Sequence, residues 1–220
     1  MQLVTLIFAA VCSVVVSAAP SPRSTAKDNT GLGLEPDHTY IFLRQRGDRL
    51  NTFDLVDQSQ NDHVLYHIAG RSTFSRHLSV TPDDHALVHD ESWTIDSGFA
   101  HLYIQREKQD TLVDEPIQVP RSKYPLTRKH GEIEFKKHRF MVKDGDGNPL
   151  VGAFNVYRVR MGRDGQEELV KLMVVDPSAL RFKHEMSKIT VTRSYQDLVE
   201  EDPAVEGFLV ALAAAKTLVR

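Results

Sequence analysis

Two histidines four residues apart, His85 and His89, have the type and spacing that best fit metal binding. They follow Thr81-Pro82-Asp83-Asp84, a sequence typical of a helix start, and one helical turn would place both imidazoles on one face beside acids. Such ligands suit zinc or another divalent cation. A surface histidine pair near acids explains the same residues, because the sequence indicates no third ligand. The pair is therefore a candidate metal site, and no cofactor is predicted.

Other motifs that resemble metal sites lack an essential residue. Residues 144–148 (DGDGN) begin like a calcium loop, but Pro149 and Asn155 stand where an EF-hand needs glycine and glutamate. A hairpin turn rich in Asp and Gly explains these residues, with weak calcium binding as the alternative. Residues 184–188 (HEMSK) have Lys188 where the zincin motif has its second histidine. His63 and His67 lie on a predicted strand, where four residues span about 13 Å, too far for one ion.

A cluster of basic residues between positions 121 and 139 could bind an anionic partner. Its lysines and arginines are Arg121, Lys123, Arg128, Lys129, Lys136, Lys137 and Arg139. The only acids among them are Glu132 and Glu134. Cations gathered on one edge raise the local potential, so anionic lipid headgroups are a candidate partner. A solvated strand edge, where lysine blunts aggregation, is the other interpretation.

The overall charge argues against one class of partner. The chain has 27 Lys and Arg against 30 Asp and Glu, a net charge of −3 with the 10 histidines neutral. Nucleic-acid binding needs a clearly basic field, so this balance speaks against it. There is no Gly-x-Ser-x-Gly elbow and no glycine-rich phosphate loop before a helix.

Residues 1–19 have the pattern of a secretory signal peptide. An uncharged apolar run from Leu3 to Val16 is followed by small residues, so cleavage after Ala18 or Ala19 is expected. A retained anchor is the alternative, although the run is at the short end of what spans a bilayer. The only cysteine, Cys12, lies within the leader. We therefore predict a secreted mature chain without a transmembrane segment, whose stability depends on burial and not on disulfides.

After a predicted flexible linker over residues 20–36, the chain reads mainly as β-structure. Short runs rich in apolar and β-branched residues alternate with turn signals, and no helices separate them. The predicted strands are Tyr40–Leu43, Thr52–Val56, His63–Ala69, Ser92–Ile95, His101–Gln105, Ile133–Phe135, Arg139–Lys143, Leu150–Val159, Leu169–Val175, Leu180–Phe182 and Lys188–Arg193. About twelve such strands indicate one antiparallel sandwich or barrel over residues 37–220.

The C-terminus predicts a helix over Ala204–Val219. Asp202-Pro203 provides an N-cap and a first-turn proline, and residues 208–215 (FLVALAAA) are apolar on every face. A helix of this kind is either buried on all sides or lies in a membrane. Eight residues cannot span a bilayer, so we expect the helix to lie inside the β-structure. Trp93, the only tryptophan, is expected to pack in the core.

Three segments carry a resemblance to a known family: residues 140–151 (FMVKDGDGNPLV), residues 188–193 (KITVTR) and residues 206–214 (EGFLVALAA). The first is similar to the strand–turn–strand hairpin, and the third to the last helix, of the tubby C-terminal-like superfamily, which includes phospholipid scramblases, LURP-one-related proteins and fungal tubby-like proteins of unknown role. The resemblance covers about Tyr40 to Val219. The resemblance implies a barrel of about twelve antiparallel strands with a hydrophobic C-terminal helix in its centre. The leader departs from a mostly intracellular family.

Two functional hypotheses follow. The first is a secreted, non-enzymatic binding domain for an anionic lipid surface or a protein partner. The second is a secreted hydrolase or metal-dependent enzyme whose site is dispersed over several strands. The sequence shows no recognisable catalytic cluster, which favours binding over catalysis.

Overall fold

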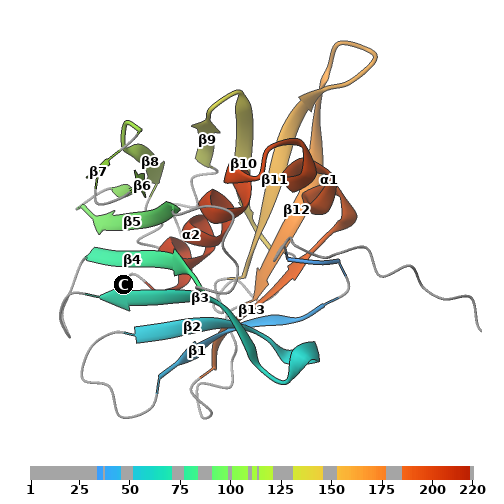
Figure 1. Ribbon diagram of the computed structural model, residues 1–220. Coiled ribbons are helices and arrows are strands. Elements are labelled where there is room, and N and C mark those ends of the chain that lie inside the picture. Colours follow the sequence, from blue (N-terminus) through green and yellow to red (C-terminus); the bar gives the residue numbers. More distant parts are fainter. Residues whose placement is uncertain are drawn as a thin grey trace, which may run out of the picture. The chain divides into compact units, whose positions relative to one another are not determined.

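Alternating apolar side chains produce antiparallel strands over most of the residues that the structure describes (Figure 1). The computed structural model describes residues 34–36, 38–45, 52–70, 77–83, 91–98, 101–108, 111–112, 114–120, 131–145, 153–176 and 185–218. All of them belong to one unit, Gly31–Arg220. The strands are β1 (Tyr40–Arg44), β2 (Thr52–Asp57), β3 (His63–Gly70), β4 (His77–Pro82), β5 (Glu91–Ser97), β6 (His101–Lys108), β7 (Thr111–Leu112), β8 (Ile117–Pro120), β9 (Gly131–Phe135), β10 (His138–Asp144), β11 (Phe154–Met161), β12 (Glu167–Asp176) and β13 (Glu185–Val191). The helices are η1 (Gln58–Gln60), α1 (Arg193–Glu201) and α2 (Ala204–Leu218).

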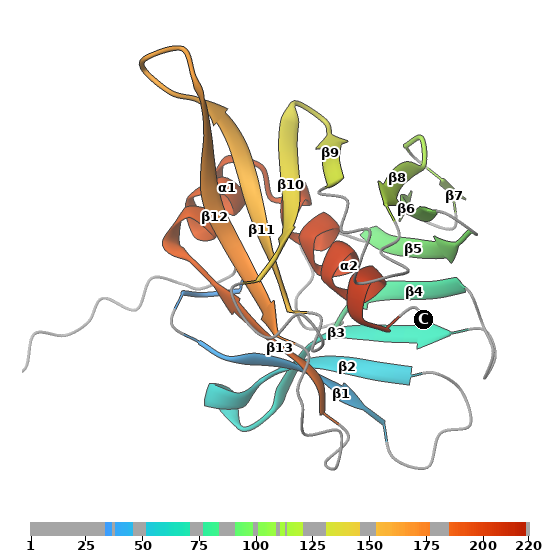
Figure 2. The same ribbon diagram turned by 180° about the vertical axis from the view of Figure 1, so that it is seen from behind.

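These strands form one 13-stranded sheet that curls into a nearly closed antiparallel barrel (Figures 1 and 2). The strand order is β7-β6-β5-β4-β3-β2-β1-β13-β12-β11-β10-β9, with β8 paired to β6. The first and last strands in the sequence, β1 and β13, pair with each other, with Tyr40 opposite Ile189. Strand β8 contacts β9, which brings the sheet edges together. The predicted barrel of about twelve antiparallel strands is confirmed.

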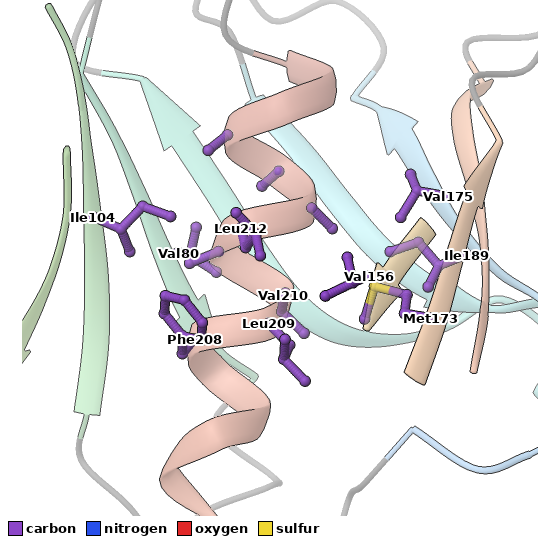
Figure 3. Packing of buried hydrophobic residues seen from close by; sticks show 14 of the residues in the cluster. Val80, Ile104, Val156, Met173, Val175, Ile189, Phe208, Leu209, Val210 and Leu212 are labelled. Carbon is purple, nitrogen blue, oxygen red and sulfur yellow. The ribbon is translucent and has the colours of Figure 1, made fainter. Parts of the chain in front are cut away.

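Helix α2 occupies the interior of the sheet (Figure 3). Every residue from Phe208 to Ala215 is 0% exposed. The helix contacts β4, β5, β6 and β13, and its apolar side chains meet inward residues of the sheet such as Val80, Ile104 and Met173. An all-round apolar helix finds apolar partners on every side only when a sheet encloses it. The prediction that the C-terminal helix is buried inside the β-structure is confirmed.

An aromatic cluster fixes where α2 approaches the sheet. Trp93 of β5 is 2% exposed and packs edge-on to Phe135 of β9, while Phe135 stacks on Phe208 at 4.8 Å between centroids. Phe140 of β10 adjoins Phe208 at 5.5 Å. A Cβ on Gly207 would lie 2.3 Å from Trp93 Nε1, so this position requires glycine. The predicted core role of Trp93 is confirmed.

Some elements differ from the prediction. Helix α1 was not expected: the chain leaves β13 at Val191 and turns at Thr192, the N-cap of α1, so that Arg193 is helical and not in a strand. Thr81 and Pro82 end strand β4, where Leu78 and Val80 are buried, so they are not the first residues of a helix. The helical turn expected to carry His85 and His89 lies outside the described residues and stays a prediction. The predicted strand Leu180–Phe182 lies outside the described residues. In the part of the chain described above, no helix is long and apolar enough to cross a membrane.

Candidate functional site

Four of the seven basic candidates lie outside the described residues: Arg121, Lys123, Arg128 and Lys129. They belong to the connection between β8, which ends at Pro120, and β9, which begins at Gly131. The histidines His85 and His89 are also outside the described residues, between β4 and β5. Both sites therefore stay predictions. Among the residues with a described structure, no group of three or more His, Cys, Asp or Glu could hold a metal ion.

The other three basic candidates lie at the β9–β10 turn, and each is paired with an acid. Lys136 Nζ lies 2.9 Å from Asp202 Oδ1, and Lys137 Nζ lies 3.0 Å from Glu201 Oε1. Arg139 on β10 pairs with Glu132 on β9 and, at 2.7 Å, with Glu167 on β12. These ion pairs join the β9–β10 turn to the junction between α1 and α2, so this half of the basic cluster is balanced by local negative charge.

Two acids in this network, Glu201 and Asp202, have lowered pKa values. Hydrogen bonds from Lys137 and Arg158 lower the pKa of Glu201 to about 2. Burial raises the pKa of Asp202, but the hydrogen bond and charge of Lys136 outweigh it, and the net shift is downward. Both carboxylates are charged at neutral pH and hold their lysines in place.

His138, which lies in the sequence between Lys137 and Arg139 of the basic cluster, is buried. Its side chain is 1% exposed, and Nδ1 lies 3.1 Å from Arg158 Nη2. Burial and the nearby Arg158 charge lower the pKa of His138. The neutral imidazole accepts from Arg158 and adds no positive charge to the surface.

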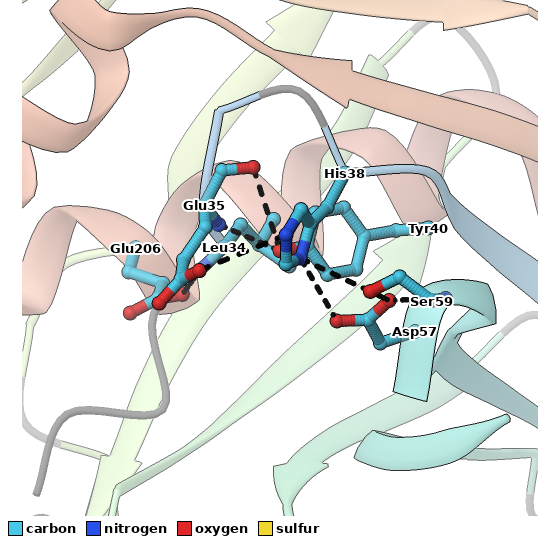
Figure 4. Close-up of polar contacts among 7 residues, drawn as sticks. All are labelled: Leu34, Glu35, His38, Tyr40, Asp57, Ser59 and Glu206. Carbon is cyan, nitrogen blue, oxygen red and sulfur yellow. Dashed lines mark hydrogen bonds and ion pairs between the residues drawn. The ribbon is translucent and has the colours of Figure 1, made fainter. Parts of the chain in front are cut away.

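A Ser, a His and an Asp come together where β2 leads into η1 (Figure 4). Ser59 Oγ donates to Asp57 Oδ1 at 2.7 Å, and the Ser59 backbone N–H donates to the same oxygen at 2.8 Å. His38 Nδ1 lies 3.2 Å from Ser59 Oγ and 3.2 Å from Asp57 Oδ2. Burial raises the pKa of Asp57, but these hydrogen bonds outweigh it and the pKa is lowered.

This trio does not have the geometry of a serine hydrolase triad. A triad places the serine hydroxyl at one imidazole nitrogen and the carboxylate at the other. Here both groups contact Nδ1 of His38, and the hydroxyl proton is directed at Asp57. Asp57 is the N-cap of η1, so the contacts are explained as capping of that short helix.

A second histidine cluster lies on the outer face of β2, β3 and β4. His67 Nδ1 is 2.8 Å from Asp54 Oδ1, and His67 Nε2 is 3.3 Å from Asp83 Oδ1. Burial lowers the pKa of His67, but its two carboxylate partners outweigh burial and raise it. Since both ring nitrogens face acids, the imidazole acts here as a hydrogen-bond donor and not as a metal ligand.

Sequence reasoning missed one buried acid, Glu206 in the first turn of α2. It is 8% exposed and accepts a hydrogen bond from the Leu34 backbone N–H at 2.9 Å (Figure 4). Burial raises its pKa to about 7. The sequence feature that could have indicated this buried acid is its position as the one acid in the first turn of the apolar C-terminal helix.

Comparison of the chain with protein-family models, with curated proteins and with solved structures found no match. The resemblance to the tubby C-terminal-like superfamily therefore stays a prediction.

Proposed function

We propose that this chain is a secreted, non-enzymatic binding domain that contacts its partner through the outside of its barrel. The interior position of α2 supports this most strongly. Barrels that hold a small ligand keep their interior open to it, whereas here residues 208–215 are fully buried among the inward side chains of the sheet. A binding surface would then consist of outward side chains, loops and strand edges.

A protein is the partner that the described surface favours. Lys136, Lys137 and Arg139 are balanced by acids, which weakens the attraction for an anionic membrane. The β11–β12 hairpin extends beyond its neighbours, because β10 pairs with β11 only as far as Val159 and β13 pairs with β12 only from Met173. Strand edges without a neighbour can accept an extended segment of another protein.

Met161 marks the end of this hairpin. At 66% exposure, it is the one exposed large hydrophobic side chain among the residues that the structure describes. The tip also carries the charged residues Arg160, Arg163, Asp164, Glu167 and Glu168, all exposed. An apolar side chain surrounded by mixed charge is typical of a small protein-binding surface.

Site-specific cross-linking tests this proposal. The mature chain has no cysteine if the leader is removed, so Met161→Cys carries one photoreactive label at the hairpin tip, and Thr81→Cys carries it at an exposed position on β4 as the matched control. We expect a predominant cross-linked protein from Met161→Cys that excess unlabelled chain displaces. Equal products at both positions, or products that unlabelled chain fails to displace, would contradict a binding surface at the hairpin.

An anionic surface is a second candidate, supported by the sequence between positions 121 and 130. This stretch holds Arg121, Lys123, Arg128 and Lys129 and no acid. Each unpaired cation near a charged membrane contributes about 1 kcal/mol. Replacing Lys123, Arg128, Lys129 and Lys137 by Gln should therefore weaken binding at least about a hundredfold, with a smaller share from Lys137 because Glu201 already pairs with it. Sedimentation with phosphatidylserine vesicles at low and physiological salt measures this.

The matched control removes the same charge elsewhere on the surface. Lys108, Arg163, Lys171 and Lys188 are exposed and lie outside the basic cluster, so replacing them by Gln should leave vesicle binding nearly intact. If the unsubstituted chain fails to sediment at low salt, or both quadruple variants bind alike, the basic cluster is a solvated strand edge. Only the proposal of a protein partner then remains.

A further inference from the structure

The carboxyl group of Glu206 is buried against a segment from the other end of the described chain. Residues 34–36, which we call the N-terminal strap, precede β1 and lie against α2 (Figure 4). Leu34 is 2% exposed, and its N–H donates to Glu206 Oε1 at 2.9 Å across 172 residues of sequence. The Glu35 N–H donates to Tyr40 Oη at 2.6 Å. The strap is thus held by one apolar side chain and by hydrogen bonds to Glu206 and Tyr40.

Among the described residues, the groups that face Glu206 come from the strap and from three other elements, and none of these groups is a cation. Tyr40 lies on β1, Tyr66 on β3 and Tyr195 on α1, and each interacts electrostatically with the carboxyl group. The Tyr195 hydroxyl is buried without a hydrogen-bond partner of good geometry. Glu35 and Asp57 add negative charge next to Tyr40. An ionised Glu206 therefore has the Leu34 N–H and the poorly aligned Tyr195 hydroxyl as neutral donors, and no opposite charge among the described residues.

The protonation states of these groups are set by burial. Burial raises the pKa of Tyr40 to about 12 and those of Tyr66 and Tyr195 well above the usual 10, so the phenols stay neutral at physiological pH. For Glu206, burial is the largest effect on the pKa, and the hydrogen bonds from Leu34 and Tyr195 offset it only in part. Glu206 thus titrates near neutral pH, whereas the three phenols do not.

We propose that the strap is a pH-sensitive latch, docked on Glu206 while its carboxyl group is protonated and released as the group ionises. A buried carboxylate without a cation is costly, and removing the strap gives it water. The neutral acid keeps an oxygen that accepts from Leu34 N–H and needs no solvation of charge. The latch is independent of the partner proposed above.

The direction and size of the effect follow from proton linkage. In the docked state Glu206 keeps its proton up to a pKa of about 7, whereas a hydrated glutamate has the ordinary value of 4.5. The docked state binds more protons, so docking is strongest at acid pH and weakens as pH rises through 7. Between pH 6 and pH 8 the docking constant should fall about tenfold.

Thiol labelling measures strap release directly. Leu34→Cys places a single thiol on the strap of the mature chain, and Met161→Cys gives the labelling rate of an exposed thiol at each pH. The ratio of the two rates corrects for thiol ionisation. We expect the Leu34→Cys rate, relative to Met161→Cys, to rise about tenfold from pH 6 to pH 8. Adding Glu206→Gln, which keeps the acceptor oxygen but does not titrate, should make the ratio independent of pH.

Two further measurements keep the test decisive. Ser187→Cys, nearly isosteric at a fully buried site on β13, reports opening of the whole barrel and should stay protected at both pH values. Hydrogen exchange of the Leu34 amide in the unsubstituted chain, corrected for the intrinsic pH effect, should follow the thiol result without any substitution in the strap. Equal strap protection at pH 6 and pH 8, an unchanged response in Glu206→Gln, or parallel exposure of Ser187→Cys would each overturn the latch.

Discussion

Individual residues decide how closely α2 can approach the sheet. Gly207 lies in a helix, where alanine is normally favoured by about 1 kcal/mol, yet the Trp93 indole occupies the space that a Cβ would need. The sequence predicted a core role for Trp93 but could not predict its contact with Gly207. That contact depends on the distance between α2 and β5, which cannot be predicted from a local sequence pattern.

Gly207→Ala should therefore destabilise the fold in spite of its better helix propensity. We expect a loss of about 1–3 kcal/mol, because an overpacked site must shift neighbouring atoms. Urea denaturation measures the free energy of unfolding. The matched test is a double-mutant cycle with Trp93→Phe, whose smaller ring frees space for a methyl group. If Gly207→Ala costs as much in the Trp93→Phe background as in the unsubstituted chain, the contact is not the cause.

The pairing of His67 with two carboxylates is a second residue-scale feature. The sequence places His67 on a strand, but the register that brings Asp54 and Asp83 beside it is set by pairing with β2 and β4. Such registers depend on the barrel as a whole, so the candidate residues on neighbouring strands could not be grouped from sequence.

Asp83→Asn should lower the pKa of His67, which an NMR pH titration of the imidazole measures. The raised pKa in the folded state means that the pair adds stability below the unfolded value of 6.5, and that this stability is lost as pH rises through the folded pKa. The variant should melt below the unsubstituted chain at pH 5.5 and alongside it at pH 8.5. A difference of the same size at both pH values would show that protonation is not involved.

At the scale of elements, predictability followed the strength of the pattern. The all-round apolar run of α2 and the alternation of β9 (GEIEF, buried at every second residue) are unambiguous in sequence. Helix α1 buries only Tyr195 and Leu198, and β8 has four residues, so neither produces a long period. These short elements form through contacts with the rest of the barrel, and such tertiary contacts leave no periodic pattern in the local sequence.

Leu212→Asp should prevent folding of the barrel. Leu212 is 0% exposed in the middle of α2, and a buried unpaired carboxylate should cost more than about 4 kcal/mol. Soluble yield and thermal melting measure the effect. Met161→Asp, the same charge at an exposed position, serves as the control and should melt near the unsubstituted chain. A Leu212→Asp protein with an unchanged melting temperature would mean that α2 is not the core of the barrel.

At the scale of the whole molecule, the barrel is stabilised without disulfides if the leader is cleaved, and burial is the main contribution. The core cluster joins residues from every part of the described chain, from Leu34 to Ala215, and includes strands, both α-helices and the strap. The only cysteine, Cys12, precedes all of them. A domain of about 190 residues can bury enough apolar surface to fold without covalent cross-links.

This leads to a prediction about processing and redox behaviour together. Secreted protein should begin at Ala19 or Pro20, as mass spectrometry of the intact chain would show, and should melt at the same temperature with and without reductant because no thiol remains. A chain that kept its leader would retain Cys12 and could form a disulfide-linked dimer on a non-reducing gel. Matched expression of Cys12→Ser separates the two cases, since it removes such a dimer but leaves a cleaved product unchanged. Full-length chain recovered from membranes would refute the signal peptide and support a retained anchor. A cleaved chain without a thiol would show that the barrel and its internal helix are stable without any disulfide.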